Sequence, residues 1–214
     1  MLDELISFTN REDFWGDWHL RLEQAQFQQD TLTFIVSTIK DAYPPADDTL
    51  QWWRVECKGL VTESGIGRLN VPNYRINLLN EHPLLWQYEE RLHLLLTGRV
   101  KSLPELLGEM FLKHIETCGN WLDFNGMVAG LHWRLQQEGE AEMLLPKRLL
   151  QFYQPILEKH GLKVNVEPGL DATPGLKMLL IGNPHMSEDN YRFGQVYVVA
   201  EEFSAMTVAP NSSF

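Results

Sequence analysis

The sequence has few of the features that identify secreted or membrane proteins. It contains two cysteines, Cys57 and Cys118, far apart and without a C-x-x-C motif, so a disulfide framework is not expected. No apolar run approaches the roughly 18 residues that cross a bilayer, and the start lacks the basic region and apolar core of a signal peptide. We therefore expect a cytoplasmic protein that does not associate with membranes.

The sequence also has few positively charged residues. The chain carries 18 Lys and Arg residues against 29 Asp and Glu residues, which gives a formal net charge of −11. Such a charge repels phosphate backbones at long range, and no local basic patch offsets it. The composition therefore argues against a nucleic-acid partner.

Signatures of nucleotide, metal and nucleophilic chemistry are missing as well. Gly65-Ile66-Gly67 lacks the third glycine of a dinucleotide fingerprint, and no lysine stands where a P-loop needs one. The H-E-x-x-H pattern of zinc hydrolases is absent, and no nucleophile can be assigned a neighbouring base. We expect no cofactor, and the sequence favours a non-catalytic protein over an enzyme.

What is present is the composition of a folded globular protein, with 44% hydrophobic and 22% charged residues. Alternating apolar patterns predict strands near both ends of the chain, including a hairpin over 18–38, whereas helical spacing dominates from about 102 to 160. We therefore predict an α+β fold, with mostly antiparallel sheets and the helical middle packed on one face. A single domain over 1–214 is the preferred division; the alternative is a β-rich half, 1–98, followed by an α/β half, 99–214.

Several local signals refine this picture. Asn80–Pro83 reads as a turn that leaves the chain extended into 84–86, and Ser102-Leu-Pro-Glu105 matches a helix capping box. Leu112 projects from the polar side of the following helix, which predicts contacts on both sides of it. Helical spacing resumes over 124–135, 138–142 reads as an acidic surface loop, and Pro146 opens a helix that ends at His160-Gly161.

His114 and Cys118 lie one turn apart on the apolar side of the first of these helices. Their side chains could share a metal ion only if further ligands joined them, and Cys57, His82 and His93 are the obvious donors. The simpler interpretation is a core histidine with one hydrogen-bond partner beside a small buried thiol. The metal set of Cys57, His82, His114 and Cys118 is kept as an alternative.

Trp52 and Trp53 point to opposite faces of the strand predicted over 51–58. Trp53 shares its face with Val55 and Cys57, so Trp52 lies on the other face, either under a second element, as we expect, or at a binding surface. The candidate binding residues are Trp52, His82, Trp86 and His185, the last in a polar loop over 182–190.

Seven tryptophans in an acidic chain are compatible with an interaction surface, because interface cores favour aromatic residues. The preferred hypothesis is thus a cytosolic, non-catalytic protein-interaction or regulatory protein that binds a protein partner or self-associates. One alternative is a metal-assisted hydrolase or other metal enzyme using the Cys/His set. The other is a small-molecule binder with tryptophan platforms, which requires a concave pocket.

Overall fold

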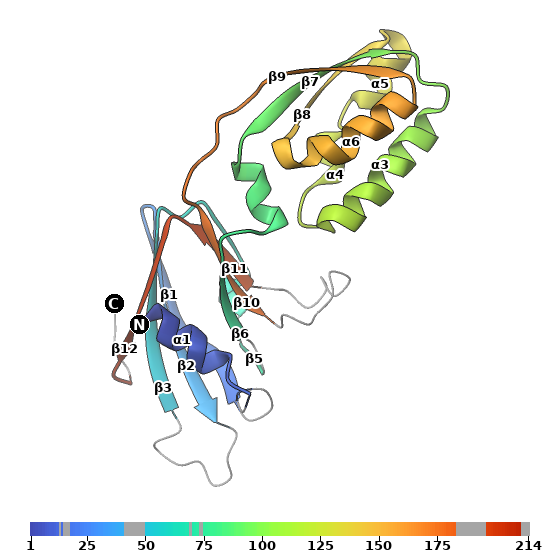
Figure 1. The fold of residues 1–214 in the computed structure, drawn as a ribbon. Coiled ribbons are helices and arrows are strands. Elements are labelled where there is room, and N and C mark those ends of the chain that lie inside the picture. The colour runs from blue at the N-terminus through green and yellow to red at the C-terminus, as the bar shows by residue number, and fades with distance from the viewer. Residues whose placement is uncertain are drawn as a thin grey trace. The chain divides into compact units, whose positions relative to one another are not determined.

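The computed structural model describes residues 1–12, 14, 18–40, 50–68, 70–72, 75–182 and 196–210 (Figure 1). The fold is α+β, as predicted, and the strand pairs among the described residues are antiparallel. Internal contacts divide the chain into two compact units. The first combines Met1–Glu81 with Gly175–Phe214, and the second is His82–Pro174. Whether the chain folds as one domain or two stays a prediction.

Two sheets and a helix form the first unit. The five-stranded sheet has the order β12-β3-β2-β1-β5, and the four-stranded sheet has the order β4-β11-β10-β6. The five-stranded sheet comprises β1 (Trp18–Gln28), β2 (Thr31–Lys40), β3 (Leu50–Lys58), β5 (Asn70–Pro72) and β12 (Glu202–Val208). The other elements are α1 (Leu2–Thr9), β4 (Thr62–Ser64), η2 (Ile66–Arg68), β6 (Arg75–Leu79), β10 (Lys177–Gly182) and β11 (Val196–Ala200).

The core of the first unit is formed by side chains from both sheets and from α1. Phe34, Trp53 and Val55 come from the five-stranded sheet, while Leu179 and Val198 come from the four-stranded sheet. The predicted hairpin is confirmed, since β1 pairs with β2 across the turn at Gln29 and Asp30. Burial alternates along β3 as the period-two pattern predicts, because successive side chains of a strand point to opposite faces.

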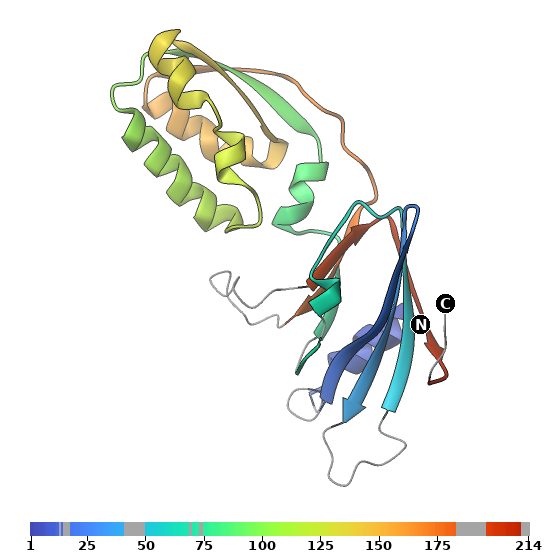
Figure 2. The same ribbon diagram turned by 180° about the vertical axis from the view of Figure 1, so that it is seen from behind.

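The second unit packs helices on a three-stranded sheet with the order β8-β7-β9. Both outer strands are antiparallel to β7, so they run parallel to each other, and α6 forms the crossover between them. The helices cover one face of this sheet (Figures 1 and 2). Its elements are η3 (Pro83–Tyr88), β7 (Arg91–Gly98), α3 (Leu103–Cys118), α4 (Phe124–Met127), α5 (Leu131–Gln137), β8 (Glu140–Pro146), α6 (Lys147–Lys159) and β9 (Leu162–Pro168).

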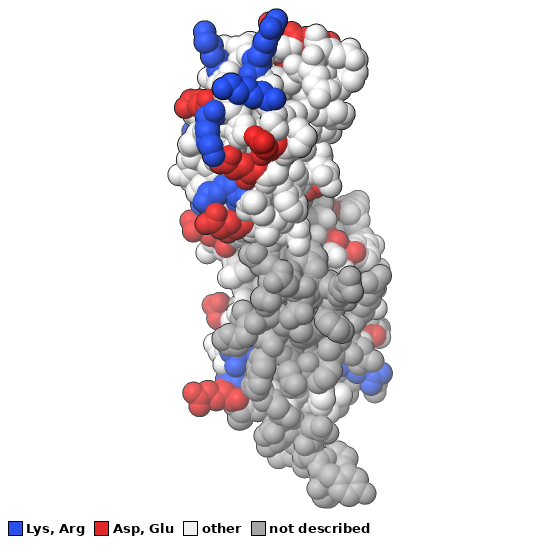
Figure 3. Space-filling view, turned by 90° about the vertical axis from the view of Figure 1, so that its right-hand side faces the viewer, with Lys and Arg blue, Asp and Glu red and all other residues white. Residues whose placement is uncertain are grey.

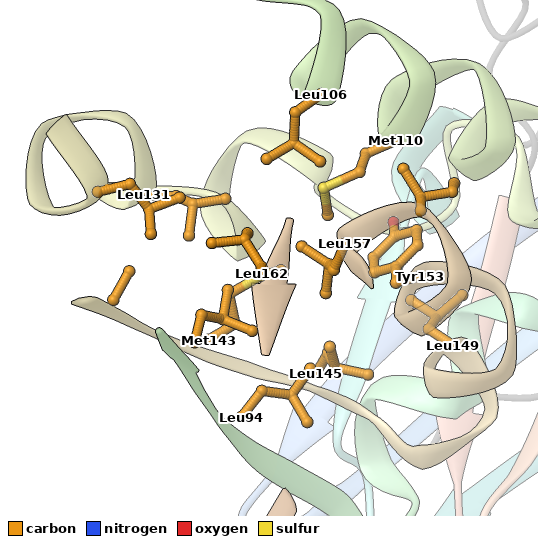
Figure 4. Close-up of a cluster of buried hydrophobic side chains, with 14 of the residues drawn as sticks. Leu94, Leu106, Met110, Leu131, Met143, Leu145, Leu149, Tyr153, Leu157 and Leu162 are labelled. Atoms are coloured by element: carbon orange, nitrogen blue, oxygen red, sulfur yellow. The ribbon is translucent and has the colours of Figure 1, made fainter. Parts of the chain in front are cut away.

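Leucine and methionine dominate the core of the second unit (Figure 4). Leu94, Met143 and Leu145 rise from the sheet toward Leu106 and Met110 of α3, with further contacts from α5 and α6 (Figure 4). Burying such side chains is worth about 1.5–3 kcal/mol each, which makes this layer the main source of stability in the unit.

Three local predictions in this unit are wrong in whole or in part. The segment after Pro83 is a 3₁₀-helix, although His82 itself is extended, as a residue before proline should be. Of the acidic loop expected over 138–142, Glu138 and Gly139 form a turn, but 140–142 belong to strand β8, whose glutamates face solvent while Ala141, Met143 and Leu145 are buried. Helical structure over 124–137 is interrupted at Gly130, which adopts φ 78°, a left-handed conformation that glycine tolerates.

The start of α3 is predicted correctly, but its cap is not. Ser102 is the N-cap residue and the helix begins at Leu103. No side-chain hydrogen bond caps the helix, however, so the serine hydroxyl does not satisfy a first-turn amide as a capping box would. The boundary follows instead from the extended backbone of Ser102 and from Pro104, whose missing N–H costs nothing in the first turn.

None of the helices in the described parts of the chain is long and apolar enough to cross a membrane.

Candidate functional site

The candidate site is a groove between α3 and α6, and Leu112 is its most exposed apolar residue. This side chain is 71% exposed and Phe111 beside it is 45% exposed, although α3 otherwise buries its apolar residues. The sequence predicted contacts on both sides of this helix, and Leu112 has its outer side open to solvent. Such exposure of large apolar side chains is a property of interaction surfaces.

Helical periodicity explains how α3 forms one wall of the groove. Glu109, Leu112, Lys113 and Glu116 follow the i, i+3, i+4, i+7 spacing of one helix side. The opposite wall is α6, which contributes Phe152, Pro155 and Ile156 along with Gln151. Together they enclose about 410 Å³ with an apolar floor between charged rims.

The charges of the rims are partly paired with each other. Lys113 Nζ lies 2.9 Å from Glu116 Oε2 and 5.5 Å from the centre of the Phe152 ring, so it bridges the two walls. At the other end, Lys159 and His160 donate to Glu109 over 2.8 and 3.0 Å. These hydrogen bonds lower the pKa of Glu109. Acidic and basic side chains are also interspersed on the described part of the face shown in Figure 3.

A buried hydrogen-bond network lies behind the groove and joins its two walls. His114 of α3 is fully buried, with Nδ1 2.6 Å from the hydroxyl of Tyr153 on α6 and Nε2 3.0 Å from the carbonyl of Leu122. The carbonyl can only accept, so Nε2 carries a proton and Nδ1 accepts from the tyrosine. Burial lowers the pKa of His114 and raises that of Tyr153, which keeps both groups neutral.

The thiol of Cys118 belongs to the same buried region. It donates to the backbone carbonyl of His114 over 3.3 Å and has no solvent exposure. Its Sγ also lies 3.5 Å from the ring nitrogens of His114, so the histidine has Tyr153, Leu122 and Cys118 around it, where a single partner was expected. The arrangement fixes α3 against α6 and so fixes the width of the groove.

The other residues of the hypothetical metal set have structural surroundings of their own. Cys57 is buried in the core of the first unit, and burial raises its pKa to about 12, so the thiol is protonated. His82 accepts the amide of Leu84 at Nδ1 and packs edge-on against Trp121 at 4.4 Å, while burial lowers its pKa to about 4. Across the described ranges, no three His, Cys, Asp or Glu side chains form a group able to hold a metal ion.

The predicted binding residues lie apart from the groove. Trp52 is half-buried on the face of β3 opposite Trp53, and α1 packs on the Trp53 side, with Phe8 6.5 Å from that ring. Trp86 packs at the margin of the second core, with the Arg148 guanidinium 5.9 Å from its ring. His185 lies outside the described residues. Sequence reasoning identified Leu112 but missed Phe152 and Pro155, because nothing local connects residues 40 positions apart.

Comparison of the chain with family models, with curated proteins and with solved structures gives no match.

Proposed function

We propose that this protein is a non-catalytic interaction protein whose α3–α6 groove binds an amphipathic helix of a protein partner. The observation that carries the proposal is the 71% exposure of Leu112 on the α3 wall of a groove with two helical walls. Grooves of this kind accept the apolar face of a helix, with anchors at i, i+3 or i+4, and i+7. Burying Leu112 and Phe152 under such anchors supplies the driving force.

The charges indicate which helix fits best. Glu109 and Glu116 lie on the α3 rim, where Lys159 and Lys113 already pair with them, and the whole chain carries a formal charge of −11. A partner with lysine or arginine beside its apolar stripe is attracted at long range, and the rim glutamates then set its orientation. We therefore expect a basic amphipathic helix and not an acidic one.

The proposal is tested with a displayed library of helical peptides selected on the immobilised protein. Selected peptides should share an apolar stripe with basic flanks, and their affinity is measured by fluorescence anisotropy. Leu112→Asp should weaken binding about tenfold or more, because it replaces an apolar contact of the α3 wall by a charge. The matched control is Leu170→Asp, which changes another exposed leucine of the same unit, 54% exposed and outside the groove.

Three results would overturn the proposal. Selection could yield no common apolar stripe, or Leu112→Asp could bind as well as Leu170→Asp. Alternatively, sedimentation could show that the protein self-associates and that Leu112→Asp alone makes it monomeric, in which case the groove is filled by a second copy. Both variants should keep the stability of the parent within about 0.5 kcal/mol, since both positions are exposed.

A further inference from the structure

A second cavity in the 82–174 unit, separate from the groove, has a different chemical character. It encloses about 580 Å³ between η3, α4 and strand β8, which is an edge strand of its sheet. Leu122, Met127 and Leu144 give it apolar walls, while Arg91, Asp123 and Glu142 bring charge to it. A cavity of this size with a few polar groups among apolar walls has the form of a small-molecule site.

The charges of this cavity are not paired in the way that surface charges usually are. Arg91 forms no ion pair with any described residue, and its Nε is buried without a hydrogen-bond partner in the described structure. Asp123 is the N-cap residue of α4, yet its carboxylate makes no capping hydrogen bond and no ion pair with a described residue. A cation and an anion thus line one cavity without pairing with each other or with their described neighbours.

Glu142, the third charged residue of the cavity, differs from Arg91 and Asp123. Glu142 lies 3.4 Å from His93 and 3.8 Å from Arg134, so its charge already has partners. Gly126 permits the present position of Asp123, because a Cβ at Gly126 would lie 2.6 Å from Oδ2 of Asp123. The glycine leaves the space that the carboxylate occupies beside the cavity.

We propose that this cavity binds a free α-amino acid with an apolar side chain. Arg91 would hold the ligand's carboxylate, Asp123 its ammonium group, and Leu122, Met127 and Leu144 its side chain. A ligand with only one charge would leave either Arg91 or Asp123 without a counter-charge, which is most costly for Arg91, because its Nε is buried. A zwitterion satisfies both, and the apolar walls select against charged side chains.

The experiment measures binding by calorimetry to the full chain, using leucine, methionine, phenylalanine, aspartate and lysine as probes. Leucine, methionine and phenylalanine should bind, with aspartate and lysine about tenfold weaker or absent. N-acetyl-leucine lacks the ammonium group and leucinamide lacks the carboxylate, so each should lose about tenfold relative to leucine.

Two variants connect the binding to its residues. Arg91→Gln and Asp123→Asn should each weaken leucine binding about tenfold, the usual result of losing a charged hydrogen bond. Their matched controls, Arg99→Gln and Asp171→Asn, lie outside the cavity and should leave affinity unchanged. Leu112→Asp should also bind leucine normally, which separates this inference from the proposed function.

The inference is overturned if none of the five amino acids binds at millimolar concentration. It is also overturned if N-acetyl-leucine or leucinamide binds as tightly as leucine, since recognition would then not involve both charges. Should Arg91→Gln fold poorly, the exposed Asp123 still decides, because equal leucine affinity in Asp123→Asn and Asp171→Asn would exclude the proposed ammonium contact.

Discussion

The two cores of this protein are built on different principles. The first unit buries side chains between two sheets and one helix, with Phe34, Trp53 and Ile76 among them and Cys57 as its thiol. The second buries leucine and methionine around His114 and Tyr153, which hydrogen-bond across the contact between α3 and α6. Both units bury polar groups, but the first buries the hydroxyls of Thr9, Ser37 and Thr38, whereas the second buries an imidazole whose two ring nitrogens have fixed directions.

The two kinds of contact fix different features of the structure. Apolar burial, which dominates the first core, is non-directional and depends on side-chain volume and on the register of the strands. One directional contact adds to it, because Thr9 of α1 accepts the amide of Ile76 of β6. In the second core, a shift of α6 along α3 would leave His114 or Tyr153 without a partner in a site that water does not reach. Directional contacts therefore fix the helix pair that forms the walls of the candidate groove.

The largest expected effect is in the first core. Trp53→Ala should destabilise the first unit by about 3–5 kcal/mol, because it removes a large buried side chain and leaves a cavity. Its neighbour Trp52 is the matched comparison, since Trp52→Ala removes the same atoms from the half-buried face and should cost only about 1–2 kcal/mol. Denaturant unfolding, with hydrogen exchange assigned to β2 and β3, measures both. Equal losses of stability in the two variants would mean that the two faces of β3 are equally buried.

An intermediate effect is expected at the polar contact of the second core. Tyr153→Phe keeps the ring but removes the hydroxyl, which leaves Nδ1 of buried His114 with only the weak thiol donor of Cys118, 3.5 Å away. The cost should be about 1–3 kcal/mol, the desolvation penalty of an unsatisfied group. Tyr197→Phe, at a half-buried position of the first unit, should cost less than about 1 kcal/mol when measured in the same way. A smaller loss for Tyr153→Phe than for Tyr197→Phe would remove the distinction between the two cores.

The smallest effect is expected at the start of α3. Ser102 has the position and backbone of an N-cap, but its hydroxyl makes no capping bond. Ser102→Ala should therefore change stability by less than about 0.5 kcal/mol, although a functioning serine cap is worth about 1 kcal/mol. The denaturant midpoint of the variant gives the answer. A full 1 kcal/mol loss would show that the hydroxyl caps the helix in solution.

Much of the fold follows from local patterns in the sequence. Alternation predicted the β1–β2 hairpin and the two faces of β3, and helical spacing predicted α3 and α6, because each pattern reflects one buried side of one element. Strand β8 escaped prediction because its glutamates at 140 and 142 read as a loop, while the apolar residues between and after them face the core. Local sequence does not reveal which element will cover a residue.

The candidate groove was only half predictable for the same reason. The position of Leu112 on the polar side of α3 is visible in the helical period, but the second wall depends on how α6 packs, which is a tertiary contact. The unpaired charges of the second cavity are still harder to foresee. Arg91 and Asp123 are common surface residues in sequence, and their isolation becomes apparent only when their surroundings are known.

The connectivity of the first unit also determines the order in which its strands can pair during synthesis. Strands β6 and β10 pair with each other, Leu79 opposite Met178, and the whole second unit is inserted between them. A ribosome therefore completes the segment 82–174 before it produces β10, β11 and β12, the partners that β6, β4 and β3 require. Until then the earlier strands present unpaired edges, a state in which nascent chains associate with one another. The second unit can form its own core during this interval, whereas the first must wait for its last strands.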